Sequence, residues 1–310
     1  MTAVVSGSIA FDSIMVFDGR FKEHILPDQI HILNVSFLVP QMRREFGGCA
    51  GNIAFNLAML GGDVAPLGTV GSDAGPYLTW FEEHGIRCDA VRTFDETLTA
   101  QAFITTDLDD NQITAFHPGA MGEAAATSVS DVSGGTIGIV APNAKDAMLK
   151  HAKEFADAGV PFIFDPGQAL SQYSGDELKQ CIDLATWMTV NDYEWRMTAD
   201  RTGWDTGEVA SRVDALIVTQ GGEGSVIYTG DGDMHIDPVP PADVVDPTGC
   251  GDAYRAGILY GLMHEYDWQR TGAIASFMGS LKISHRGTQN HHRSKAQLEN
   301  DFAAATGLSL

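Results

Sequence analysis

Cysteine and basic residues are scarce in this chain. Its 310 residues include four cysteines, and 19 lysines and arginines stand against 41 aspartates and glutamates. The cysteines form no CxxC pair, so their spacing predicts neither a zinc knuckle nor a disulfide framework. A formal net charge of -22 repels nucleic-acid backbones and anionic lipids, and we therefore expect neither nucleic acid nor membrane partners.

Long apolar runs and a basic leader are also missing. No apolar run approaches the roughly 18 residues of a membrane span. The opening MTAVVSGSIAFDSIM carries Asp12 and no basic residue, unlike a signal peptide, so we expect a cytoplasmic protein. Hydrophobic residues make up 44% of the chain, enough for a large core, which argues against disorder.

Two common nucleotide-binding motifs are absent. No GxxxxGK[ST] sequence occurs, so any bound phosphate is held without a P-loop lysine. The segment Gly7-Ser8-Ile9 does not begin a GxGxxG motif after the first apolar run, which disfavours an NAD-dependent oxidoreductase.

Short apolar runs alternate with helical patterns along the chain. The runs predicted as buried strands are Ala3–Val5, Ile137–Val140, Pro161–Phe164, Thr186–Val190 and Ala215–Thr219. The predicted helices are Asn52–Leu60, Asp146–Ala156, Gly207–Val213, Asp252–His264 and Gly272–Ile283. This alternation predicts an α/β fold in which helices cover both faces of a mostly parallel sheet.

Two regions interrupt this alternation. Thr99–Thr106 and Gln112–Phe116 predict a hairpin that turns at residues 107–111, and Phe11–Phe46 is partly apolar with few helix signals. We interpret both as a small β-strand lid, formed by insertions at about 12–46 and 98–118 in a single domain that spans residues 1–310.

The segment Asp243–Gly257 carries the strongest chemical signal. A strand-like start leads into a turn with Gly249, Cys250 and Gly251, and this turn opens a helix. The free N–H groups and positive dipole end of a helix start suit a phosphate. A carboxylate such as Asp252 would repel that phosphate unless it accepts a proton from an attacking hydroxyl. From this segment alone, a helix N-cap is an equal alternative.

Four motifs in order resemble those of the ribokinase-like (PfkB) carbohydrate kinase family. They are Gly47-Gly48-Cys49-Ala50-Gly51-Asn52-Ile53-Ala54 with Gly68–Asp73, then Asn191-Asp192-Tyr193-Glu194, Val218–Gly224 and Asp246–Asp252. The resemblance covers nearly the whole chain and implies a three-layer αβα sandwich, ATP as phosphate donor and Asp252 as catalytic base. Residues 24–46, 103–107, 115–119 and 164–168 resemble bacterial adenosine kinases; Cys250 stands where many relatives carry alanine.

The resemblance also implies ligand contacts. The expected nucleoside contacts are Asp12, Ser36, Gly48, Asn52, Phe103, Phe116 and Gln168. The expected nucleotide contacts are Asn191, Thr219, Gly221, Gly224 and Gly287, the phosphate lying on Gly249, Cys250 and Gly251. Asn191 and Glu194 are expected to organise Mg²⁺ through water, and Asp246 to lie near a monovalent cation such as K⁺.

Chemistry supports these roles but leaves alternatives. A carboxylate such as Asp12 accepts bonds from vicinal hydroxyls, yet it also suits a turn after a strand. Aromatic rings of a hairpin stack on a purine or simply pack the lid. Asn191 and Glu194 also match a helix cap.

Four further residues receive expectations of another kind. Arg255, one helical turn after Asp252, is expected to form a surface ion pair, and the alternative is that it binds a carboxylate or helps with phosphate charge. His285, His291 and His292 lack the spacing of a metal site and are expected in a solvated loop.

The predicted reaction transfers the γ-phosphoryl group of ATP to the 5′-hydroxyl of adenosine, in a monomer or homodimer with small molecules as its only partners. The alternatives are a kinase for ribose or fructose and a non-catalytic nucleoside sensor. An apolar lid with Phe37, Phe103 and Phe116 exceeds what a free sugar needs. The presence of Asp252 and Glu194 argues against a sensor.

Overall fold

A nine-stranded sheet forms the centre of the molecule in the computed structural model, which describes residues 1–25, 32, 34–109 and 111–310. The strand order is β13-β12-β11-β10-β9-β8-β1-β4-β5. From β11 to β5 all neighbours pair in parallel, whereas β12 and β13 add an antiparallel edge. The strands are β1 (Thr2–Ser6), β4 (Asp63–Gly71), β5 (Val91–Phe94), β8 (Gly135–Val140), β9 (Phe162–Phe164), β10 (Trp187–Asn191), β11 (Ala215–Thr219), β12 (Ser225–Thr229) and β13 (Gly232–Ile236).

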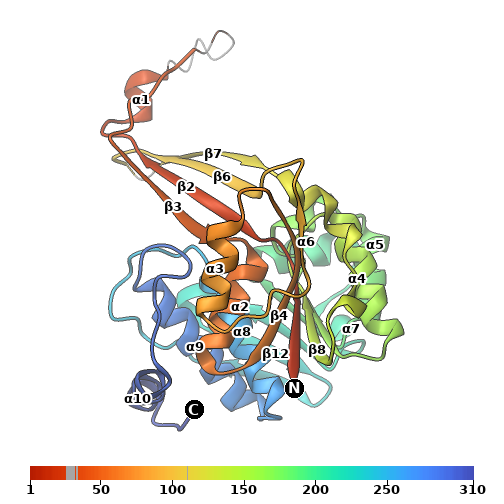
Figure 1. The fold of residues 1–310 in the computed structure, drawn as a ribbon. Coiled ribbons are helices and arrows are strands. Elements are labelled where there is room, and N and C mark those ends of the chain that lie inside the picture. Colours follow the sequence, from red (N-terminus) through yellow and green to blue (C-terminus); the bar gives the residue numbers. More distant parts are fainter. Residues whose placement is uncertain (26–31, 33, 110) are drawn as a thin grey trace.

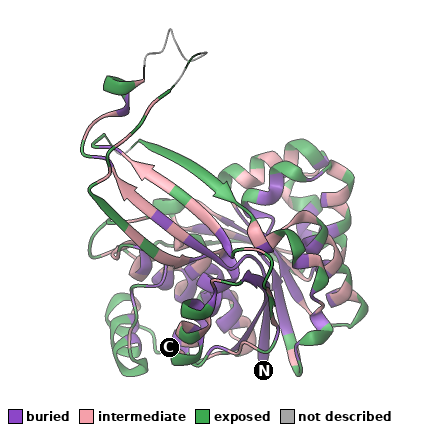
Figure 2. Ribbon diagram, turned by 45° about the horizontal axis from the view of Figure 1, so that its top comes forward, coloured by how far each residue is buried: buried purple, intermediate pink, exposed green. Residues whose placement is uncertain are grey.

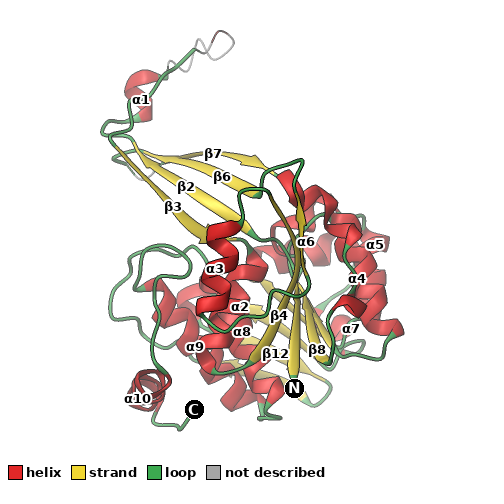
Figure 3. Cartoon of the chain, in the orientation of Figure 1, coloured by secondary structure: helices red, strands yellow, loops and turns green. Residues whose placement is uncertain are grey.

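Helices cover both faces of this sheet (Figure 1 and Figure 3). One layer holds α2 (Cys49–Leu60), α3 (Gly75–Glu83), α8 (Cys250–Met263), α9 (Trp268–Ile283) and α10 (Lys295–Thr306). The other holds α4 (Lys145–Asp157), α5 (Gly175–Leu184), α6 (Asp192–Thr202) and α7 (Thr206–Ala210). Short 3-10 helices lie at Gly119–Ala126, Val129–Asp131, Gly167–Gln172 and Gly221–Glu223.

The strands are apolar on both sides because both sides are covered. In β1, Ala3 and Val5 pack into one apolar core, and Val4 packs into the other. Continuous apolar runs of this kind are typical of parallel strands between two helical layers. The predicted three-layer α/β architecture is therefore confirmed.

A second sheet projects from one end of the first (Figure 1). Its order is β3-β2-β6-β7, from β2 (Ala10–Val16), β3 (Gln41–Gly47), β6 (Ala100–Thr106) and β7 (Gln112–His117). The β2–β6 pair is parallel and the other two pairs are antiparallel. Figure 2 shows this sheet to be far less buried than the main sheet, with β7 exposed along its length. The expected small β-strand lid is thus present.

Element ends differ from the prediction where capping decides them. The helix expected from Gly272 begins at Trp268, because Asp267 accepts the N–H of Arg270 at 2.8 Å and caps it. The lid segment also contains a short helix, α1 (Phe21–His24), whose Phe21 packs on Phe37 with ring centroids 5.0 Å apart.

Parts of the lid expectation, residues 26–31 and 33, and Asp110 in the hairpin turn, lie outside the described residues. None of the helices in the described part of the chain has the length and apolar character needed to cross a membrane.

Candidate active site

A cavity of about 760 Å³ lies between the small sheet and the main sheet. Its walls come from β2, from the starts of α2 and α8, and from the loops that follow β8, β9, β10 and β11. In open α/β sheets, ligands bind beyond the carboxyl ends of the parallel strands, which is where this cavity lies.

Both helix starts at the cavity depend on glycine. Gly48 caps α2 with φ of 84°, and Gly249 caps α8 with φ of 80°, a region that side chains disfavour. A Cβ on Gly48 would also lie 2.6 Å from the carbonyl oxygen of Ser8. Glycine therefore keeps side chains out of the turns that open α2 and α8, and at α2 the N–H groups of Cys49 and Ala50 both donate to Ser8.

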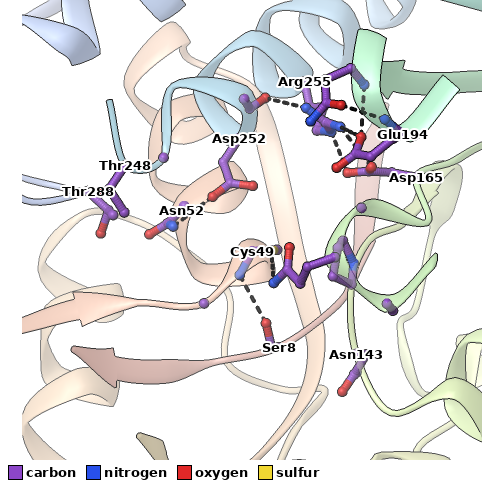
Figure 4. A pocket seen from close by; sticks show the side chains of 18 of the residues that line it. Ser8, Cys49, Asn52, Asn143, Asp165, Glu194, Thr248, Asp252, Arg255 and Thr288 are labelled. Atoms are coloured by element: carbon purple, nitrogen blue, oxygen red, sulfur yellow. Dashed lines mark hydrogen bonds and ion pairs between the residues drawn. The ribbon is translucent and has the colours of Figure 1, made fainter. Parts of the chain in front are cut away.

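Asp252 faces the cavity from the first turn of α8 (Figure 4). Its Oδ2 accepts a hydrogen bond from Asn52 Nδ2 at 2.8 Å. Burial raises the pKa of Asp252, and the N–H group of Asn52 opposes this rise. Because Gly249 is the N-cap residue of α8, Asp252 does not have the N-cap position that the sequence left open.

A hydrogen-bond chain fixes the orientation of Asn52. Asn52 Oδ1 accepts from Gln289 Nε2 at 3.0 Å, and Gln289 Oε1 accepts from Trp80 Nε1 at 2.8 Å. An indole N–H can only donate, so the Gln289 oxygen must face Trp80 and the Gln289 NH₂ group must face Asn52. Asn52 therefore turns its oxygen toward Gln289 and its NH₂ group toward Asp252. Tyr77 completes the chain by accepting from Gln289 at 2.8 Å.

The glycine-rich turn before α8 contributes to the cavity with two of its three predicted residues. Gly249 and Gly251 line the cavity, but Cys250 does not. Its Sγ points back to the carbonyl oxygen of Asp246 at 3.8 Å, and its N–H bonds to Pro247 O at 3.2 Å. A small side chain suffices there, so alanine and cysteine are interchangeable in size at this position.

The expected surface ion pair of Arg255 is wrong. Arg255 is buried and lines the cavity, because its place on α8 faces the loop that follows β9. Its guanidinium group binds both carboxylate oxygens of Asp165, and it donates to Gly251 O at 3.1 Å. Its NH2 group also lies 3.8 Å from Glu194 Oε2. Arg255 therefore holds together the start of α8 and the ends of two strands.

Asn191 and Glu194 line the cavity and also cap α6. Asn191 Oδ1 accepts the N–H of Glu194 at 2.7 Å, and Glu194 Oε2 accepts the N–H of Asn191 at 2.8 Å. The capping alternative is therefore present in the structure. It engages Oε2 of Glu194, whereas no hydrogen bond within the described chain reaches Oε1. Burial raises the pKa of Glu194, and Asp165 adds to this rise.

The small sheet adds a carboxylate and an aromatic ring. Asp12, Ala102 and Phe116 occupy neighbouring strand positions on one face and line the cavity. Burial, with Asp252 and Glu45 nearby, raises the pKa of Asp12 to about 6. Phe103 pairs with Ala115 instead, so the alternation of side chains puts it on the opposite face. The structure therefore does not place Phe103 on the cavity wall, whereas Phe116 lies there.

Of the remaining predicted contacts, some reach the cavity and others do not. Gln168, Thr219 and Gly221 line it. Ser36 is exposed in the segment between α1 and β3, and the structure does not place it on the cavity wall. Gly224 also lies outside the cavity wall. A Cβ at this position would lie 2.1 Å from Ile236 O, so close packing next to β12 explains why a glycine is needed there.

Gly287 and Asp246 lie behind the cavity wall and bind each other. The N–H of Gly287 donates to Asp246 Oδ2 at 2.9 Å, and neither residue lines the cavity. Burial opposes ionisation of Asp246, but the N–H groups of Thr248 and Gly287 outweigh it and hold its pKa below the usual value.

The histidines near the C-terminal end differ in their burial. His291 is buried and its Nε2 bonds to Asn56 Oδ1 at 2.7 Å, so the expected solvated position is wrong for this residue. Burial lowers its pKa to about 3, and it is therefore a neutral packing residue. His292 is exposed, as expected.

Sequence reasoning missed several residues in and behind the cavity wall, and four of them are polar residues next to predicted elements or motifs. They are Asp165, which follows a predicted strand, Thr288 and Gln289, which follow Gly287, and Asn143, which follows β8. A polar residue directly after a buried strand is the signal that could have identified Asp165 and Asn143. Gln289 lies behind the cavity wall. Its hydrogen-bond partners come from elements that are far away in the sequence, so no local pattern identifies it.

The sequence profile of the pfkB family carbohydrate kinases matches residues 10–295. The chain belongs to this family. This chain is 34% identical over 260 residues to a nucleoside kinase of Methanocaldococcus jannaschii. The alignment covers 83% of this chain and 85% of that one.

Two solved structures of the Burkholderia thailandensis nucleoside kinase are also similar to this pfkB protein. The inosine complex is 49% identical with a TM-score of 0.90, and the alignment covers 99% of both chains. The ADP-inosine complex is 51% identical with a TM-score of 0.88, over 99% of this chain and 97% of that one. The predicted family and ribokinase-like fold are therefore confirmed.

Proposed function

We propose that this chain is an ATP-dependent adenosine kinase, which transfers the γ-phosphoryl group of ATP to the 5′-hydroxyl of adenosine. The observation that carries the proposal is the position of Asp252. It lies on the cavity beside Gly249 and Gly251, with its carboxylate oriented by Asn52. The similar protein solved with inosine and with ADP-inosine supports a nucleoside as phosphate acceptor.

The wall formed by β2 and α2 suits the nucleoside. Asp12 and Asn52 supply a carboxylate and an amide for the ribose hydroxyls, at the end of the cavity where Gly48 leaves the backbone open. Phe116 provides a ring face for the purine, although half of it is exposed. A free pentose would leave the Phe116 side of the cavity unused, which favours a nucleoside over ribose or fructose.

The start of α8 suits the transferred phosphoryl group. Backbone N–H groups at Gly249 and Gly251 and the dipole of α8 stabilise negative charge on that group. Asp252 accepts the proton of the 5′-hydroxyl as the new O–P bond forms, and the bond from the γ-phosphorus to ADP breaks. The end of β11 at Thr219 and the following loop at Gly221 are left for the rest of the nucleotide.

Glu194 and Asn191 fit a magnesium ion held through water. Oxygen ligands and retained waters are what Mg²⁺ favours, and Glu194 Oε1 remains available beside the cap. When bound with ATP, Mg²⁺ would neutralise charge on the phosphates. Asn191 and Glu194 then have two tasks, since the same pair caps α6.

A panel of nucleosides and sugars tests the proposal, with ADP release and product identification as readouts. Adenosine is expected to give a higher kcat/KM than ribose or fructose. A higher value for a free sugar would overturn the nucleoside assignment in favour of a sugar kinase. Nucleoside binding without ATP consumption would instead indicate a sensor.

A further inference from the structure

A buried lysine lies next to the glycine-rich turn. Lys282, in the last turn of α9, is fully buried, and its Nζ donates to Asp246 O at 2.7 Å and to His285 O at 3.0 Å. A buried charge is costly unless it is paired and hydrogen-bonded. Burial lowers the pKa of Lys282, and the Asp246 carboxylate opposes this effect.

The two carbonyl groups belong to different loops behind the nucleotide end of the cavity. Asp246 begins the turn that reaches Gly249, and its carboxylate accepts the N–H of Thr248 and that of Gly287, both at 2.9 Å. His285 belongs to the loop after α9, as does Gly287. The ammonium of Lys282 therefore ties the turn that would hold phosphate to the loop after α9.

This set of oxygens is one that a monovalent cation would take. Main-chain carbonyl oxygens beside a carboxylate are hard oxygen ligands, and K⁺ resembles an ammonium group in charge and size. A K⁺ ion at Asp246 would compete with Lys282 for the same carbonyl oxygen and would add a second positive charge beside it. The residues present therefore do not fit K⁺ at this position.

We propose that the Lys282 ammonium replaces a monovalent cation in this protein, so that the turn before α8 keeps its shape without K⁺. The consequence for turnover rests on the proposed kinase function. The consequence for stability does not, and it can be measured on the protein without any substrate.

The first experiment uses the wild-type protein in KCl and in choline chloride at equal ionic strength. Choline is too large for a site made of two carbonyl groups. We expect melting temperatures that agree within about 1 °C and rates of ADP formation that agree within about twofold, because no K⁺ binds the native state. A K⁺-specific stimulation above about tenfold, or a K⁺-specific melting shift of several degrees, would overturn the proposal.

The second experiment removes the Lys282 ammonium group and so frees the two carbonyl oxygens that it binds. Lys282→Met removes the charge, and methionine is one atom shorter than lysine, which vacates the position of Nζ, so K⁺ should now bind there and raise the melting temperature by about 2–4 °C relative to choline. The rate should fall in choline and recover at least about tenfold in K⁺. A variant that keeps the wild-type rate and melting temperature in both salts would contradict the proposal.

Lys150→Met is the matched control. Lys150 Nζ also donates to two main-chain carbonyls, Ala125 O at 2.8 Å and Thr127 O at 2.7 Å, but it lies on α4 away from the cavity. This variant should show no K⁺ response in either measurement. An equal K⁺ response in both variants would assign the effect to lost lysine bonds in general and overturn the proposal.

Two outcomes are separated by the design. If no nucleoside is phosphorylated, the proposed function fails, and the melting comparison alone still decides the role of Lys282. If Lys282→Met folds in neither salt, Lys282→Arg keeps the charge and should remain independent of K⁺, and a K⁺ requirement in it would count against the proposal.

Discussion

Asp252 and Asp12 are carboxyl groups on different walls of one cavity, and burial raises the pKa of both. Their proposed tasks differ, since one accepts a proton and the other accepts hydrogen bonds from hydroxyl groups. Substitution by asparagine keeps size and hydrogen bonding in each case and removes only the charge. The two variants should therefore fail in different ways.

Asp252→Asn should lower kcat by about 10²–10⁴-fold, the usual contribution of a general base. Adenosine affinity should change little, because Asp12 and Asn52 remain. The melting temperature of the ligand-free variant should not fall, since a buried charge is removed. Asp267→Asn, at the N-cap of α9, is the control and should keep the wild-type kcat. Retention of more than about a tenth of the rate by Asp252→Asn would refute the catalytic role.

Asp12→Asn should instead lower the affinity for the nucleoside and raise the stability of the folded protein. The pKa of Asp12 rises from 3.8 in the unfolded chain to about 6 in the folded protein, so its stabilising contribution is present below pH 4 and lost as pH rises through about 6. The variant should therefore be more stable than wild type at pH 7, by at most about 3 kcal/mol, and this advantage should shrink towards pH 4.

Denaturant unfolding of both proteins at several pH values measures this difference. Nucleoside binding by the variant, measured by calorimetry, should be weaker at pH 7. A stability difference that does not vary between pH 4 and 7 would show that Asp12 has an ordinary pKa.

At the scale of the strands, the two faces of β6 and β7 have different tasks. Phe116 faces the cavity and Phe103 faces away from it, although both are partly exposed. Phe116→Ala should weaken adenosine binding by about 2- to 10-fold through the loss of ring contact. Phe103→Ala removes the same side chain from the other face and should leave the Kd unchanged. Equal losses in the two variants would indicate a general effect on the sheet.

The chain of hydrogen bonds behind Asp252 joins three further elements. Gln289→Met keeps the side-chain length but removes the partner that orients Asn52. Because Asn52 then no longer holds its N–H group toward Asp252, the acid limb of the kcat profile should move to higher pH. KM for ATP should change less than kcat. A purely structural role would lower the melting temperature and leave this limb unmoved.

Local pattern predicted much of this arrangement. The strand runs and the glycine-rich turn before α8 could be predicted because each depends on residues close in sequence, whereas Gly48 and the role of Asp252 were implied by the family resemblance. The buried state of Arg255 could not, since its partner Asp165 lies in the loop after β9, far away in the sequence. The same holds for His291, which bonds to Asn56 of α2. The faces of Phe103 and Phe116 depend on the pairing register, which the turn sets and composition does not reveal.

At the scale of the whole molecule, the acidic charge opposes the binding of ATP. The net charge is -22, and the cavity itself is lined by five carboxylates, with Arg255 as its single guanidinium or ammonium group in the described chain. These carboxylates are Asp12, Asp165, Asp192, Glu194 and Asp252. Metal-free ATP should therefore bind weakly. Its affinity should rise with salt concentration, because salt screens the repulsion between the carboxylates and the phosphates.

Glu194→Gln separates the electrostatic effect from capping. The variant loses one negative charge at the cavity, so the Kd of metal-free ATP, measured in EDTA, should fall, whereas the Mg²⁺ concentration for half-maximal rate should rise. Glutamine still completes the capping box, so the fold should be kept.

Glu177→Gln provides the matched control for this variant. Glu177 closes a similar capping box on α5, where it accepts the N–H of Ser174 at 2.8 Å, but it lies outside the cavity wall. It should alter neither the Mg²⁺ requirement nor the ATP affinity, because charge at long range is screened by salt. If both variants leave the Mg²⁺ dependence unchanged, Glu194 serves only to cap α6. If both shift it equally, the effect comes from net charge and not from a site at Glu194.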